Sequence, residues 1–179
     1  GGMLAVLGEE TNKIKDILNE NFENIKCFLA NDNSKGQLII SGKNNELIKL
    51  SKLLKDKKIK NIKLPVSAPF HCELMRSATL KMEKAINDQD LKTPTNKVVS
   101  NVTAKEYKET DEIKKLLIKQ IESPVRWRES IEYMISSGTN TFIEIGPGKV
   151  LSGLIKRINK EVKVLNIDTV EDIQSINKW

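Results

Sequence analysis

His71 is the only histidine of the 179-residue chain, so chemistry that needs an imidazole near neutral pH has one candidate. Pro65 and Pro69 bracket a stiff, extended passage just before it, and a helix is expected to follow. Such positions suit catalysis because the flanking elements fix the backbone while the side chain faces a cleft. Spacing alone favours a surface or core histidine with a structural role, and a catalytic histidine is the alternative that this position leaves open.

Two cysteines, Cys27 and Cys72, are too few for a disulfide framework and lack the neighbours of a zinc site. No metal is therefore expected. Cys72 follows His71 directly, and consecutive residues at the start of a helix point in different directions, which makes the two a poor nucleophilic pair. We expect Cys72 to serve in packing.

The turn Gly146-Pro147-Gly148 lies between an expected strand and an expected helix, where backbone N–H groups can bind an anion. A tight turn that requires positive φ explains the glycines equally well and more simply. The chain contains no G-x-G-x-x-G, no P-loop and no G-x-S-x-G nucleophile elbow. These motifs therefore supply neither a nucleotide site nor a serine nucleophile.

The elements that must position these residues fall into two groups. Over residues 1–65, apolar periodicity predicts the order βαββαβ, with strands at 3–8, 25–30, 36–42 and 59–66, helices at 14–22 and 45–54, and a turn at 31–34. This order is typical of a ferredoxin-like subdomain, an antiparallel sheet with both helices on one face.

Over residues 66–179, the pattern predicts helices at 75–85, 111–121, 127–135 and 150–158, and strands at 97–102, 141–145 and 163–167. Strands and helices alternate after residue 97, which favours a parallel sheet covered by helices. In the helix at 150–158, Val150, Leu151, Leu154, Ile155 and Ile158 are expected to face inward. The predicted fold class is α/β, with domains at 1–65 and 66–179.

Composition excludes several classes of protein. A net charge of +6, 39% hydrophobic and 30% charged residues suit a globular protein rather than a disordered or fibrous one. No apolar run approaches the length of a membrane span, and the first residues lack a signal-peptide pattern, so we expect a cytoplasmic protein without membrane contact. The strand at 36–42 offers no aromatic or basic side chain for stacking bases, so we expect no nucleic-acid partner.

Several stretches together resemble one family, the malonyl-CoA:acyl carrier protein transacylases. Residues 66–75 read VSAPFHCELM and resemble the family's histidine motif. The stretches that follow in the family's order are Gly36-Gln37, VSNV at 99–102, QIESPVRW at 120–127 and IEIGPGKVL at 143–151. The resemblance covers nearly the whole chain.

The resemblance implies the C-terminal part of an α/β-hydrolase-like core with a ferredoxin-like subdomain. It also implies malonyl transfer from coenzyme A to the phosphopantetheine thiol of acyl carrier protein through an acyl-serine, with no cofactor beyond the coenzyme A thioester. His71 matches the general base, Gln120 matches the residue whose main-chain carbonyl orients it, and Phe70 resembles the aromatic that accompanies malonyl selection in related acyltransferases.

In that family the nucleophilic serine, the carboxylate-binding arginine and the oxyanion-hole glutamine lie N-terminal to the stretch matched here. The resemblance therefore predicts an inactive fragment that needs the missing N-terminal segment as a partner. The alternative is a non-catalytic module that docks an acidic carrier protein through its excess of positive charge.

Overall fold

The computed structural model describes residues 1–176, with side chains described as far as residue 174. The chain divides into two compact units, residues 1–130 and the part from Ile131 onward. Leu64 and Val66 lie on either side of the predicted boundary at 65/66 and pack against a buried cluster on the first sheet, and the predicted domains at 1–65 and 66–179 stay a prediction.

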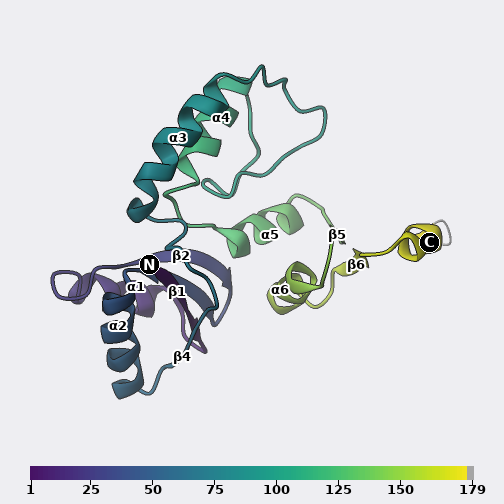
Figure 1. The fold of residues 1–179 in the computed structure, drawn as a ribbon. Coiled ribbons are helices and arrows are strands. Elements are labelled where there is room, and N and C mark those ends of the chain that lie inside the picture. The colour runs from purple at the N-terminus through teal and green to yellow at the C-terminus, as the bar shows by residue number, and fades with distance from the viewer. Residues whose placement is uncertain (177–179) are drawn as a thin grey trace. The chain divides into compact units, whose positions relative to one another are not determined.

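The first unit begins with six elements in the order predicted from periodicity (Figure 1). They are β1 (Gly2–Leu7), α1 (Thr11–Glu20), β2 (Cys27–Ser34), β3 (Gln37–Gly42), α2 (Asn44–Asp56) and β4 (Lys60–Lys63). The strands form one sheet in the order β2-β3-β1-β4, and every neighbouring pair is antiparallel. Both edges of this sheet, β2 and β4, are therefore open to further segments.

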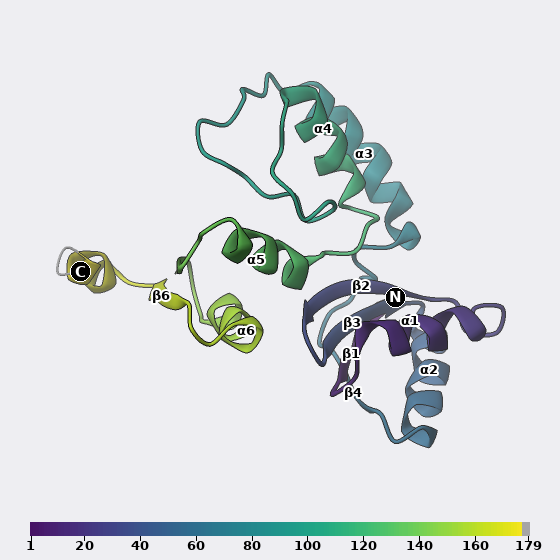
Figure 2. The same cartoon turned by 180° about the vertical axis from the view of Figure 1, so that it is seen from behind.

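Alternation along β1 explains how both faces of the sheet are buried. Leu4 and Val6 pack against apolar side chains of α1 and α2, whereas Met3 and Ala5 face a second cluster. The two helices contribute to the same cluster and so cover the same face (Figures 1 and 2). Leu54 of α2 has no exposed surface, which places the centre of the core between α2 and the sheet.

The strand predicted at 25–30 is longer than expected. The chain stays extended to Ser34, and the turn that was predicted at 31–34 lies at Lys35 and Gly36. Gly36 has φ +74° there, in the left-handed region that suits glycine. Residues that usually form turns remain in the strand because groups distant in sequence form hydrogen bonds with them. The clearest case is Asp32, which accepts a hydrogen bond from Arg128.

The named elements in the rest of the first unit are helical, a 3₁₀ turn at Glu73–Met75, α3 (Arg76–Asn87) and α4 (Thr110–Lys119), with irregular stretches between them. The strand predicted at 97–102 is wrong. Only a single bridge joins Val99 to Glu106, because the chain turns back at once: Ala104 donates its N–H to the Ser100 carbonyl. Two backbone hydrogen bonds flank this bridge, from the Ser100 N–H to the Lys105 carbonyl and from the Tyr107 N–H to the Val98 carbonyl, and the pairing does not continue into a strand.

The second unit contains β5 (Thr141–Ile145), α6 (Val150–Ile158), β6 (Lys163–Ile167) and α7 (Val170–Ile176), and α5 (Trp127–Ser136) spans the boundary. β5 and β6 are parallel, as the alternation of elements predicted. On α6, Leu154 and Ile155 are buried, as predicted. Val150 and Leu151 were expected to face inward as well, but both are exposed. Helix α7 was not predicted.

No helix in residues 1–176 is both long and apolar enough to cross a bilayer.

Candidate functional site

His71 lies between an irregular passage at 64–70, with bends at residues 65, 67 and 68, and the 3₁₀ turn that leads into α3. Its φ is +60°, in the left-handed region that a residue with a side chain rarely adopts. Such a conformation costs about 1–3 kcal/mol and persists only where surrounding contacts enforce it. Surrounding contacts therefore hold the backbone at His71 in a conformation that sets the direction of its side chain.

A hydrogen bond orients the imidazole. Nδ1 of His71 lies 3.0 Å from the main-chain carbonyl oxygen of Gln120. A carbonyl oxygen can only accept a hydrogen bond, so this contact places the ring proton on Nδ1. Nε2 then keeps its lone pair, which is the state in which a histidine acts as a base.

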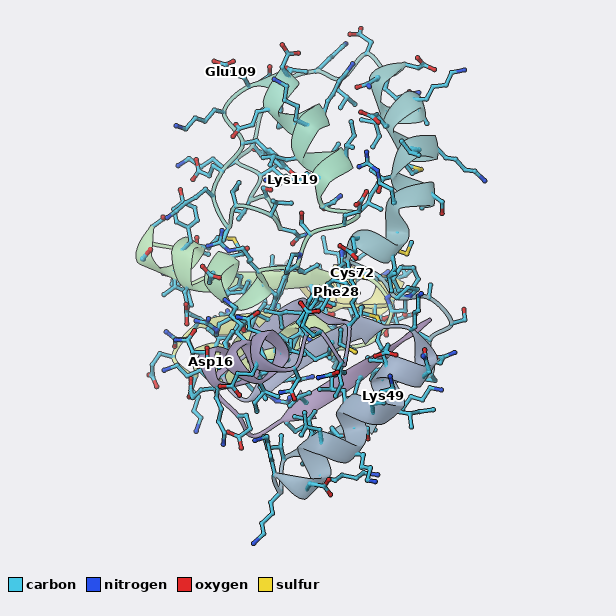
Figure 3. The ribbon with its side chains drawn as sticks, turned by 90° about the vertical axis from the view of Figure 1, so that its left-hand side faces the viewer. Asp16, Phe28, Lys49, Cys72, Glu109 and Lys119 are labelled. Carbon is cyan, nitrogen blue, oxygen red and sulfur yellow. The ribbon has the colours of Figure 1, made fainter. Side chains whose placement is uncertain are left out.

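The imidazole faces a cavity of about 400 Å³. Side chains of α1 and β2, together with residues 71–73, Glu122 and Pro124, line it, and Lys15 and Asn19 add polar groups that the sequence analysis did not single out. Phe28 and Cys72, both labelled in Figure 3, belong to this wall. The half-buried His71 thus combines an oriented ring with open space beside it.

Phe70 lies differently from the other two predicted site residues. Its side chain is 41% exposed and does not line the cavity beside His71. Its carbonyl accepts a hydrogen bond from the buried Ser41 hydroxyl of β3, which ties the backbone before His71 to the sheet. The structure therefore places His71 in contact with Gln120, whereas the Phe70 ring lies outside the cavity that His71 faces.

The two cysteines are free and buried. Burial raises the pKa of the Cys27 thiol to about 12 and raises the pKa of the Cys72 thiol as well. Cys72 donates a hydrogen bond to the Pro69 carbonyl. A neutral, hydrogen-bonded thiol agrees with the packing role predicted for it. Within residues 1–176, no three His, Cys, Asp or Glu side chains are grouped to hold a metal ion.

The helix that follows the glycine turn in the second unit binds an internal anion at its start. The Glu144 carboxylate accepts hydrogen bonds from the backbone N–H groups of Leu151 and Ser152, in the first turn of α6. A hydrogen bond from Ser152 is the main reason that the pKa of Glu144 lies below its ordinary value. Gly146 and Gly148 have φ of +132° and +89°, as a tight turn requires. The structural explanation of this motif accounts for its geometry.

Sequence comparison identifies relatives along the chain's whole length. The model of a family described as the acyl transferase domain matches residues 1–177. The malonyl CoA-acyl carrier protein transacylase of Bacillus subtilis is 42% identical over 176 residues, which are 97% of this chain and 56% of that protein. The protein of the same name from Staphylococcus aureus is 39% identical over 182 residues, 99% of this chain and 58% of that protein.

Solved structures agree with this result. A malonyl CoA-acyl carrier protein transacylase from Clostridium perfringens matches with a TM-score of 0.93 and 41% identity, over 99% of this chain and 56% of that one. An acyl-carrier-protein-S-malonyltransferase from Bartonella henselae matches with a TM-score of 0.93 and 36% identity, over 99% and 57%. The chain thus shares their α/β structure and spans a little over half of their length.

Proposed function

Because the chain belongs to the acyl transferase domain family, we propose that it supplies the general base of a transacylase that transfers malonyl groups from coenzyme A to acyl carrier protein. The observation that carries this proposal is the hydrogen bond from Nδ1 of His71 to the Gln120 carbonyl, which leaves Nε2 free as a base. The serine nucleophile comes from a segment outside these 179 residues, in keeping with the share of the relatives that the chain spans.

In the proposed reaction Nε2 of His71 takes the hydroxyl proton as the serine oxygen attacks the malonyl thioester carbon. The tetrahedral intermediate collapses, the C–S bond breaks, and the imidazolium returns the proton to the departing coenzyme A thiolate. In the second half His71 takes the proton of the phosphopantetheine thiol, which attacks the acyl-serine, and gives it to the serine oxygen. The Gln120 carbonyl keeps the ring oriented throughout by accepting from Nδ1.

The proposal also assigns the two parts of the chain to parts of a fold. We assign residues 1–65 to a ferredoxin-like subdomain, supported by the βαββαβ order and the antiparallel sheet order β2-β3-β1-β4. We assign residues 66–179 to the C-terminal part of an α/β-hydrolase-like core, supported by the parallel β5-β6 pair with α6 between its strands in sequence. Two free cysteines suit the reducing cytoplasm in which we place the enzyme.

Phe70 is proposed to restrict the acyl group to malonyl by the bulk of its ring. Its exposed ring is free to reach a substrate, and the bond from Ser41 to its carbonyl fixes the backbone from which the ring projects. Phe70→Ala should then raise the rate with methylmalonyl relative to malonyl thioester, and an unchanged ratio would remove Phe70 from the site.

The central test replaces the base. In a protein that joins this chain to the serine-bearing segment, His71→Ala should lower kcat for malonyl transfer by about 10²–10⁴-fold. Glu83→Gln, on an exposed position of α3, is the matched control and should leave the rate unchanged. Activity of His71→Ala equal to that of the control would exclude the proposed base. The 179-residue chain alone should gain no malonyl adduct in intact-mass spectra.

A second candidate function, a non-catalytic module that docks an acidic carrier protein, is favoured by one feature. Residues 43–63 hold eight lysines and two acidic residues, a local excess equal to the net charge of the whole chain. Lys52, Lys55 and Lys63 of this segment line a cavity together with the apolar Leu47 and with Leu4 of β1. Binding of carrier protein that weakens steeply with salt, without any transfer activity in the joined protein, would favour this second function.

A further inference from the structure

We propose that Asp32, through its ion pair with Arg128, is a positioning residue for His71: the pair holds the segment at 120–126 on the edge of the sheet and thereby fixes the ring tautomer. No residue of the pair touches the imidazole. The inference concerns the state of His71 and can be tested on the chain itself, whether or not the proposed transferase activity is correct.

The ion pair is bidentate, and its carboxylate is buried. Asp32 of β2 is only 4% exposed. Nε of Arg128 donates to Oδ1 at 3.1 Å, and a terminal nitrogen of the same guanidinium donates to Oδ2 at 2.7 Å. The Thr11 hydroxyl at the start of α1 adds a third donor to Oδ2, at 3.2 Å. A buried carboxylate is tolerated only with such partners, so Asp32 strongly constrains where Arg128 can lie.

The backbone next to this ion pair is also attached to β2. Val125 donates its N–H to the Ala30 carbonyl at 2.8 Å, and Asp32 donates its N–H to the Val125 carbonyl at 2.9 Å. Val125 thereby forms a parallel bridge on the open edge of the sheet. Asp32 is the residue that both attachments share, one through its main chain and one through its side chain.

The attached segment begins at the carbonyl that orients the base. Gln120 ends α4, and its carbonyl oxygen accepts both from Nδ1 of His71 and, at 3.4 Å, from the N–H of Ser123. Only four residues lie between Gln120 and Val125, and Pro124 stiffens that interval. The carbonyl therefore sits between two anchors, the end of α4 and the bridge on β2, and movement at one anchor displaces it.

A second contact couples the same anchors. The side-chain amide of Asn101 donates to Oε1 of Gln120 at 3.4 Å, while the Asn101 carbonyl accepts from the N–H of Arg126 at 3.0 Å. Both ends of the segment thus meet one residue. The Asp32–Arg128 pair lies just beyond this point and is a charged link between the C-terminal end of the segment and β2.

The test reads the tautomer directly. Because His71 is the single histidine, its two ring nitrogens are unambiguous in a long-range ¹H–¹⁵N spectrum of the labelled chain. At pH 9, where an ordinary imidazole is neutral, the wild type should show the proton on Nδ1. Asp32→Asn removes the charge at nearly constant volume and should raise the fraction with the proton on Nε2 several-fold.

The matched control separates positioning from stability. Leu54→Ala creates a cavity at a fully buried site of α2, in the cluster between the two helices and the sheet, and it should lower stability while leaving the tautomer at its wild-type ratio. If Asp32→Asn fails to fold, Arg128→Lys is measured in its place, because a lysine keeps the positive charge but cannot form the bidentate hydrogen bonds of the guanidinium.

A folded Asp32→Asn or Arg128→Lys protein with the wild-type ratio of tautomers would overturn the proposal, as would an equal shift in Leu54→Ala. A shifted tautomer together with full activity of His71→Ala in the joined protein would support the positioning role and refute the proposed function, so the two failures are distinguishable.

Discussion

At the scale of single residues, the chemistry of this chain depends on how its few reactive groups are held. His71 sits in a left-handed backbone conformation, and a main-chain carbonyl assigns its ring proton to Nδ1. A neutral acceptor orients the ring without the full charge that an aspartate would bring, so the imidazolium formed during a reaction gains less electrostatic stabilisation. The two thiols in the same wall are held neutral by burial.

Cys27 gives a prediction at this scale. Burial raises the pKa of its thiol from 9.0 to about 12, so at pH 8 its thiolate fraction is about a thousandfold smaller than in the unfolded chain. Alkylation by iodoacetamide should be correspondingly slow in the folded chain and should accelerate on adding urea. Modification of Cys27, located by peptide mass spectrometry, at the same rate with and without urea would contradict the burial that the structure shows.

The same pKa predicts a pH dependence of stability. The folded chain holds the thiol proton more tightly than the unfolded chain, so the contribution of Cys27 is present below pH 9 and is lost as the pH rises from 9 toward 12. The free energy of unfolding in urea should therefore fall more steeply between pH 8 and 10.5 in the wild type than in Cys27→Ala.

At the scale of elements, helix ends and strand edges carry the interactions that order the chain. Helix α6 begins with Glu144 of β5 bound to two of its first N–H groups, and a helix N-terminus favours such a negative charge. On β2, the open edge accepts Val125, and so a loop covers a strand edge that would otherwise offer unpaired groups. Both interactions use backbone hydrogen-bonding groups, which are present whatever the side chains are.

Glu144 gives the prediction at this scale. Its pKa is lowered by the Ser152 hydrogen bond, so its contribution to α6 is present above its ordinary pKa of 4.5 and disappears as the pH falls through the lower folded value. Glu144→Gln should increase amide hydrogen exchange at Leu151 and Ser152 at neutral pH. Glu161→Gln, an exposed change in the same unit, should not, and equal exchange in both variants would refute the capping role.

At the scale of the whole molecule, the second unit exposes apolar side chains that parallel sheets normally cover. Ile143 and Ile145 of β5 are 49% and 79% exposed, and Val150 at the start of α6 is 72% exposed. Parallel strands are usually buried on both faces, so these positions are suited to contact with further protein.

Self-association is the prediction that follows. The 179-residue chain should show a mass that rises with concentration in light scattering, because the exposed face gains free energy by leaving water. Ile145→Lys should reduce this association, whereas Leu80→Lys, a 56% exposed site on α3 in the other unit, should reduce it less. A monomer at all concentrations would show that the exposed face does not drive association.

The sequence by itself determined the βαββαβ order, the parallel β5-β6 pair, the packing role of Cys72 and the family, because apolar periodicity and short motifs are local properties. Only the tertiary structure decided that Asp32 belongs to a strand rather than a turn, that residues 97–102 form no strand, and that α6 is buried on half of its expected stripe. These outcomes depend on partners distant in sequence, such as Arg128 for Asp32, and a local pattern holds no information about which distant group will satisfy a buried charge.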